Sequence, residues 1–169
     1  RALLDGERLT FEGTHFRVDS ARLWDLPDEP VELGVAVSGP QSISRFAPLA
    51  DHLVAVQPDG DALERWDAER ERAGAGPSRK SGQMPISWGP DPEAATRRAH
   101  AEFRWFAGGW KVNADLPTTE AFDAASQFVT PEVVAEQIPC GPGLDAVVEA
   151  AGAFRDAGFT DPGCDAPPA

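Results

Sequence analysis

Hydrophobic and polar positions between residues 31 and 59 follow the order strand, tight turn, helix, strand. Residues 31–37 are mostly apolar, which is typical of a strand in a parallel sheet that helices cover. A helix is expected from about Pro40 to Ala50, and a second apolar strand over residues 52–56. The segment therefore predicts one βαβ unit of a parallel sheet.

The next segments continue this alternation of helix and strand. Residues 61–73 predict a helix, and residues 72–81 predict a loop because they are rich in glycine, serine and charge. Residues 83–88 predict another strand. Pro85 lacks the N–H that a ladder requires, so we expect an edge position or a bulge there.

The second half of the chain predicts helices with clear start and stop signals. Asp91, Pro92 and Glu93 combine a capping acid, a first-turn proline and a second acid, which indicates a helix start. The apolar face of this helix would hold Ala95, Ala99, Phe103 and Phe106. Two short helices are expected to begin near Thr118 and Thr130, and a last one covers residues 143–157 before Gly158.

The two ends of the chain differ from this pattern. Residues 9–12 and 15–18 flank Gly13 and Thr14, which predicts a small hairpin. Residues 160–169 hold several prolines and lack a β-branched core. We therefore expect an irregular tail rather than a buried strand at this end.

Composition and charge exclude several classes of function. The chain is 41% hydrophobic and 25% charged, as expected of a globular domain with a core. Its net charge of −13 argues against nucleic acid as a partner, because phosphate-backbone binding requires clustered Lys and Arg. An apolar run of roughly 20 residues, as a membrane span requires, does not occur in the sequence, and neither does a leader pattern. We expect a cytoplasmic protein that does not enter the membrane.

The two cysteines, Cys140 and Cys164, are too few for a disulfide framework. Neither has a second Cys or a His at metal-ligand spacing. We expect free thiols and no metal site.

The turn after the first strand, Ser38-Gly39-Pro40, carries the clearest candidate chemistry. The amides of Ser38, Gly39 and Gln41 would lie at a helix N-terminus, where backbone donors and the helix dipole favour an anion. Pro40 suits the first helical turn, which needs no donor from it. On spacing alone, a plain helix start is the commoner interpretation of such a turn.

Four motifs in order indicate a family. They read FEGTHF at residues 11–16, ARLWDLPDEP at 21–30, AVSGP at 36–40 and IPCGP at 138–142. This series resembles the luciferase-like flavin and deazaflavin oxidoreductases, specifically the coenzyme F-420-dependent group related to glucose-6-phosphate dehydrogenase. The resemblance extends from Arg1 to about Phe159 and matches only the C-terminal half of that family.

The resemblance implies an α/β fold, namely part of an eight-stranded (β/α) TIM barrel. Such a barrel typically needs about 250 residues, and this chain has 169 and begins at Arg1 without Met. We therefore expect a fragment or truncated product. Residues 1–159 would form an incomplete barrel with about three core strands, the fifth to seventh, and residues 160–169 the irregular tail.

The resemblance also implies a cofactor, coenzyme F-420, which is an 8-hydroxy-5-deazaflavin. Ser38, Gly39, Gln41 and Ser42 would hold its phosphate-bearing tail through backbone amides and hydroxyls. FMN is the alternative cofactor, since luciferase-like monooxygenases share the barrel and the turn.

The expected substrate is a small organic molecule that accepts or donates a hydride. Sugar-phosphate members of the group place a hydroxyl and a lysine just after the sixth strand, where this chain has Val56 and Asp59. Since Asp59 would repel a phosphate, we expect a neutral or differently charged substrate. Trp88 and Trp110 are further candidates for the substrate pocket.

Catalytic residues stay unknown at this point, because the family places them in the N-terminal half. His15, His52 and His100 lie away from predicted strand C-terminal ends, where such barrels gather their active sites. Two rival functions stay open. One is an FMN-dependent luciferase-like monooxygenase, and the other is a non-catalytic half-barrel or interaction subunit that self-associates through exposed strand edges.

Overall fold

The structure is a computed structural model that describes residues 1–165, without the side chains of Trp110 and residues 162–165. The chain divides into two compact units, residues 1–34 and the part from Val35 onward. The parallel sheet lies in the second unit.

The first unit is built around a two-stranded hairpin. β1 (Leu9–Glu12) and β2 (Arg17–Ala21) pair antiparallel, with Glu12 opposite Arg17. The rings of Phe11 and Phe16 lie 5.6 Å apart across the turn, a separation typical of a favourable aromatic pair. The predicted hairpin is therefore confirmed.

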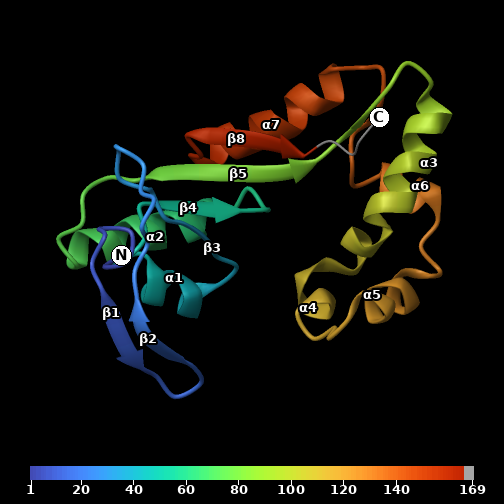
Figure 1. Cartoon of the computed structure of the whole chain (residues 1–169). Helices are drawn as coiled ribbons and strands as arrows, with labels where there is room; N and C mark the ends of the chain where they lie inside the picture. Colours follow the sequence, from blue (N-terminus) through green and yellow to red (C-terminus); the bar gives the residue numbers. More distant parts are fainter. Residues whose placement is uncertain (166–169) are drawn as a thin grey trace. The chain divides into compact units, whose positions relative to one another are not determined.

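The second unit contains a four-stranded sheet in the order β3-β4-β5-β8. Its strands are β3 (Gly34–Ala36), β4 (His52–Ala55), β5 (Arg79–Pro85) and β8 (Asp161–Asp165). β5 is parallel to both β4 and β8, and Figure 1 shows these three strands side by side. Helices α1 (Pro40–Phe46) and α2 (Gly60–Arg72) connect the first three strands. Strands that neighbour each other in chain order, with helical crossovers, form part of an unclosed (β/α) barrel, as predicted.

Residues 161–165 differ from the predicted irregular tail, because they form β8. All five pair with residues 81–85 of β5, including Pro162 opposite Gly82. An edge strand tolerates proline, since one of its two sides needs no ladder partner. The incomplete barrel thus has four strands in the described part of the chain, rather than about three.

β5 also begins earlier than predicted, inside the expected loop over residues 72–81. The Lys80 ammonium lies 2.7 Å from the Asp67 carboxylate on α2, so its charge has a partner beside the sheet. β5 ends at Pro85, and β6 (Ser87–Trp88) leaves this sheet to pair in parallel with β7 (Cys140–Gly141). Pro85 is thus the last residue of a central strand rather than an edge position or a bulge, and the predicted seventh strand is divided in two.

Between β6 and β7 the chain forms a group of helices. These are α3 (Pro92–Phe103), the 3-10 helix η1 (Arg104–Gly108), α4 (Gly109–Asn113), α5 (Thr119–Ser126) and α6 (Pro131–Ala135). Asp91 caps α3 as predicted, since its Oδ1 accepts from the amides of Glu93 at 2.9 Å and Ala94 at 3.3 Å. Ala99, Val134 and Ile138 form the buried core of this group.

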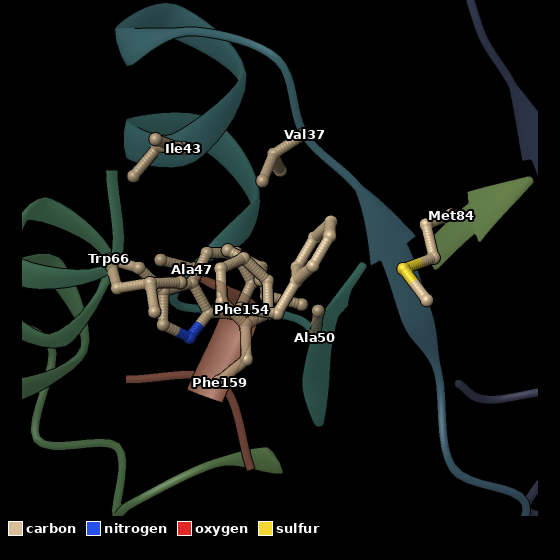
Figure 2. Packing of buried hydrophobic residues seen from close by; sticks show 10 residues of the cluster. Val37, Ile43, Ala47, Ala50, Trp66, Met84, Phe154 and Phe159 are labelled. Atoms are coloured by element: carbon tan, nitrogen blue, oxygen red, sulfur yellow. The ribbon is translucent and has the colours of Figure 1, made fainter. Parts of the chain in front are cut away.

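The main core lies between the sheet and helices α1, α2 and α7 (Asp145–Ala157). Gly158 ends α7 in the left-handed conformation, with φ of 102°, as its position predicts. Figure 2 shows this core, in which the rings of Phe154 and Phe159 lie 5.1 Å apart. Its buried members are Val37, Ile43, Ala47, Ala50, Leu53, Leu63, Trp66, Met84, Phe154 and Phe159.

One charged residue belongs to this interior. Arg70 on α2 is only 8% exposed. Its Nη1 donates to the carbonyls of Ala47 at 2.9 Å and Ala50 at 2.5 Å, and its Nε donates to Gly76 at 2.8 Å. The guanidinium thereby satisfies the carbonyl of the α1 C-cap, Ala47, and that of Ala50 just after it, which fixes this end of α1 against α2.

Helix α7 packs closely against the sheet at Gly82. A Cβ at this position would lie 2.3 Å from Phe154 Cδ1. We predict that Gly82→Ala lowers the free energy of unfolding by about 1–3 kcal/mol, because the added methyl group would overpack the core. Gly76→Ala is the matched control, since a Cβ there meets nothing within 4 Å. Urea denaturation of both variants checks this, and equal stability of Gly82→Ala and the parent would contradict the packing.

Candidate functional site

The turn between β3 and α1 forms a small set of converging backbone donors. The amides of Ser38 and Gly39 both point at Ser42 Oγ, at 3.4 and 3.3 Å. The Ser42 hydroxyl in turn donates to the Gly39 carbonyl at 2.9 Å. Gly39 has extended backbone, and a Cβ there would meet nothing within 4 Å, so the space beside the turn is open.

This geometry refines the predicted anion site. The amides of Ser38 and Gly39 already have an acceptor, the Ser42 hydroxyl, and Gln41 is exposed beside them. A phosphate oxygen accepts more strongly than a hydroxyl, because a charged acceptor strengthens the hydrogen bond. The arrangement can therefore accept an anion if Ser42 turns its own hydroxyl toward it. The assignment of all four residues to a cofactor stays a prediction.

The end of β4 lies beside this turn. The amide of Val37 donates to the Val54 carbonyl at 3.1 Å, so Ser38 and Val56 each follow this bonded pair along neighbouring strands. Val56 is 47% exposed. The structure therefore brings the predicted cofactor turn and one predicted substrate-pocket residue to the same edge of the sheet.

Asp59 begins helix α2 in the same loop. Its Oδ1 accepts from the amide of Ala62 at 3.1 Å, which makes it the helix cap. A shallow, open hollow at this loop is lined by Gln57, Pro58, Asp59, Gly60 and Asp61. The hollow is thus acidic, although one oxygen of Asp59 is already engaged by the backbone.

Trp88 lies at the C-terminal end of β6, in a different sheet from β3 and β4. It is 54% exposed, and its indole N–H donates to the Pro142 carbonyl at 3.3 Å. The fourth substrate-pocket candidate, Trp110, lies in α4, but its side chain is outside the described residues. The structure therefore gives Trp88 a fixed position and leaves Trp110 a prediction.

The histidines lie away from strand C-terminal ends. His52 is the first residue of β4, at the opposite end of that strand from Val56. The His100 ring is half-buried, with Nε2 2.8 Å from the Val129 carbonyl oxygen. These positions agree with the sequence prediction that both residues lie away from strand C-terminal ends.

The Cys140 thiol lies in β7, half-buried, and its Sγ donates to the Ile138 carbonyl at 3.2 Å. Burial raises the pKa of Cys140, and this outweighs the opposing effects of the Thr96 hydroxyl and the Arg98 charge. The thiolate is therefore scarce near neutral pH. Among the side chains that the structure describes, three or more of His, Cys, Asp or Glu never gather as metal ligation would require.

Two polar side chains that bond the backbone near Trp88 were not predicted from the sequence. Ser87 is fully buried and its Oγ donates to the Ala95 carbonyl on α3 at 2.8 Å. Arg98, also on α3, donates through Nη2 to the Trp88 carbonyl at 2.6 Å. The only sequence signal for Arg98 is its place beside the predicted apolar face of this helix.

The second unit is part of a (β/α) barrel, with an open turn at the C-terminal ends of its strands. The sequence profile of the luciferase-like monooxygenase family matches residues 1–161, and the chain belongs to this family. The family inferred from the ordered motifs is thereby confirmed.

Two curated relatives are F420-dependent enzymes of Mycobacterium tuberculosis. The F420-dependent hydroxymycolic acid dehydrogenase of strain ATCC 25618 / H37Rv is 36% identical over 113 residues, which cover 64% of this chain and 31% of that protein. The F420-dependent glucose-6-phosphate dehydrogenase of strain CDC 1551 / Oshkosh is 32% identical over 104 residues, covering 56% and 31%. The matched segments thus span about a third of each relative.

Two solved structures share the fold. An F420-dependent secondary alcohol dehydrogenase in complex with an F420-acetone adduct superposes with a TM-score of 0.74 at 20% identity. The coenzyme F420-dependent tetrahydromethanopterin reductase from Methanopyrus kandleri gives 0.67 at 16% identity. Each covers 99% of this chain, which spans 53% and 54% of their lengths. At such identities the likeness shows the fold alone.

A separate observation concerns membranes. Among the described helices, every one is too short or too polar to cross a bilayer.

The raised pKa of Cys140 predicts low reactivity toward alkylating agents. In a Cys164→Ser variant, which leaves Cys140 as the remaining thiol, iodoacetamide should react more slowly at pH 8 than it does with free cysteine, because burial disfavours the reactive thiolate. The rate should rise with pH toward the raised pKa. Mass spectrometry over time measures it, and a rate at or above that of free cysteine would contradict the burial of this thiol.

Proposed function

We propose that this chain is the C-terminal part of a coenzyme F-420-dependent oxidoreductase that transfers a hydride between the deazaflavin and a small organic substrate. The observation that supports it most is the identity of 36% and 32% with two dehydrogenases whose names state F420 dependence. When bound, the coenzyme supplies the hydride chemistry, and the protein supplies binding and orientation.

In this proposal, the turn from Ser38 to Ser42 holds the phosphate-bearing tail of the coenzyme. The fit rests on two features of the turn: two converging amides, and open space beside Gly39. The hydroxyl of Ser42 would donate to a phosphate oxygen, and the amides of Ser38 and Gly39 would donate to that oxygen in place of Ser42 Oγ. Gln41 is exposed in the first turn of α1.

The substrate of this proposal is neutral or cationic. Val56 and Asp59 follow β4 at the edge that also carries the cofactor turn, and Asp61 adds a second carboxylate to the hollow there. Two carboxylates repel an anionic substrate at short range, where solvent screens them least. Glucose 6-phosphate is therefore disfavoured as the substrate, and catalytic residues are assigned to the part of such enzymes that this chain does not match.

We further propose self-association through the sheet edges. Within residues 1–165, β3 and β8 each pair with a neighbour on one side only, and open strand edges favour pairing with another chain. Static light scattering should give a mass above that of one chain, and a monomer at micromolar concentration would contradict this. The cytoplasmic location predicted from the sequence stays a prediction.

The cofactor assignment predicts selective binding. Titration with coenzyme F-420, followed by fluorescence, should give a dissociation constant that Ser42→Ala weakens about tenfold, because one hydrogen bond to a charged oxygen is lost. Ser44→Ala is the matched control on the same helix. Its hydroxyl donates to the Glu69 carboxylate at 2.9 Å and, with Arg72, lowers the pKa of Glu69, so its loss should leave coenzyme binding unchanged.

Three outcomes of this titration would contradict the proposal. Equal weakening in Ser42→Ala and Ser44→Ala would place the phosphate tail elsewhere. Tight FMN binding without F-420 binding would favour the FMN-dependent monooxygenase. A folded chain that binds neither cofactor would favour a non-catalytic half-barrel, with folding checked by circular dichroism.

A further inference from the structure

The corner formed by β6, β7 and α3 fixes the backbone of Trp88 from two sides. On one side, the amide of Ser87 donates to the Pro139 carbonyl at 2.9 Å, and that of Gly89 to the Gly141 carbonyl at 3.4 Å. On the other side, Arg98 reaches from α3 and donates to the carbonyl of Trp88 at 2.6 Å. The peptide group of Trp88 is thereby held between a strand and a guanidinium.

The residue after Trp88 makes room for this contact. A Cβ on Gly89 would lie 3.1 Å from Arg98 Nη2, closer than a relaxed van der Waals contact. Glycine at this position therefore admits the guanidinium to the end of β6. The contact between Arg98 and Trp88 depends on this local shape as well as on the hydrogen bond.

The Trp88 ring is also held at its far end. Its indole N–H donates to the Pro142 carbonyl, in the loop that leads to α7. Even so, the residue is 54% exposed. A large ring that is fixed at both ends and still open to solvent offers a flat apolar face for contact with another molecule.

One nitrogen of the Arg98 side chain lacks a hydrogen-bond partner in the described part of the chain. Its Nε is buried and has no hydrogen-bond partner among the described residues. A buried donor without an acceptor costs stability. An apolar side chain would avoid this cost, so stability alone does not explain an arginine at this position. Its Nη2 bond to the strand end is the feature that distinguishes it from an apolar side chain of similar length.

We propose that Arg98 is a positioning residue, which fixes Trp88 so that the exposed indole forms a rigid apolar wall of the substrate pocket. The proposal rests on the proposed function in giving this wall a substrate. The substrate class it favours presents a flat or apolar face to Trp88.

The fluorescence of Trp88 tests this directly and needs no cofactor. Its contribution is the difference between each protein and the same protein carrying Trp88→Phe. Arg98→Met should shift Trp88 emission to longer wavelength and increase its quenching by acrylamide, because the strand end and the ring are released. Arg98→Lys should restore part of the effect, since an ammonium can make one bond to the Trp88 carbonyl.

Arg97→Met is the matched control. Arg97 is the neighbouring arginine of α3, and it lies 3.5 Å from the exposed Glu93 carboxylate. Unchanged Trp88 fluorescence in Arg98→Met, or an equal change in Arg97→Met, would overturn the proposal. If Arg98→Met does not fold, as circular dichroism would show, Gly89→Ala displaces the same guanidinium and should give the same shift. A loss of coenzyme binding would leave these readings unaffected, so the two proposals fail separately.

Discussion

The parallel pairing of β5 with β4 on one side and β8 on the other is the constraint on which the second unit depends. It joins the end of the described chain to residues about 80 positions earlier, with Ser81 opposite Asp161. Helix α7 packs closely over the sheet beside this pairing, and Gly82 makes that possible because Phe154 occupies the space of its missing Cβ. Once β5 is fixed, β4 and the helices beside it have a surface on which to pack.

The geometry of the candidate site depends on this scaffold. Arg70 donates to the carbonyls of Ala47, the C-cap of α1, and of Ala50 just beyond it, so the short helix cannot shift along the sheet without losing these hydrogen bonds. The N-terminal end of the same helix carries the turn from Ser38 to Ser42. A side chain with no part in chemistry therefore sets where two amides converge, and the acidic loop after β4 lies at the same edge. Membership of the luciferase-like monooxygenase family gives this arrangement its most economical explanation.

Local signals in the sequence were sufficient for most elements, and tertiary contacts decided the rest. Asp91 and Gly158 predicted the start of α3 and the end of α7, because caps depend on neighbouring residues alone. β8 was missed because Pro162 argues against a strand unless the strand lies at an edge, which local sequence cannot show. The sequence predicted the turn, but it did not predict the hydrogen bonds between Ser42 and the backbone of Ser38 and Gly39. Arg70 follows Leu63 and Trp66 at helical spacing on the buried side of α2. The spacing therefore indicated a buried position, but the charge of arginine argued against it.

Residue-resolved hydrogen exchange, measured by NMR on the free chain and with coenzyme F-420, tests the account most directly. The account predicts that amides of residues 80–84 are among the slowest to exchange, since β5 lies inside two ladders. It also predicts that the amides of Ser38 and Gly39 gain protection when the coenzyme is added. Exchange of the β5 amides at the rate of an unstructured peptide would contradict the barrel, and unchanged exchange at the turn would contradict its role in binding.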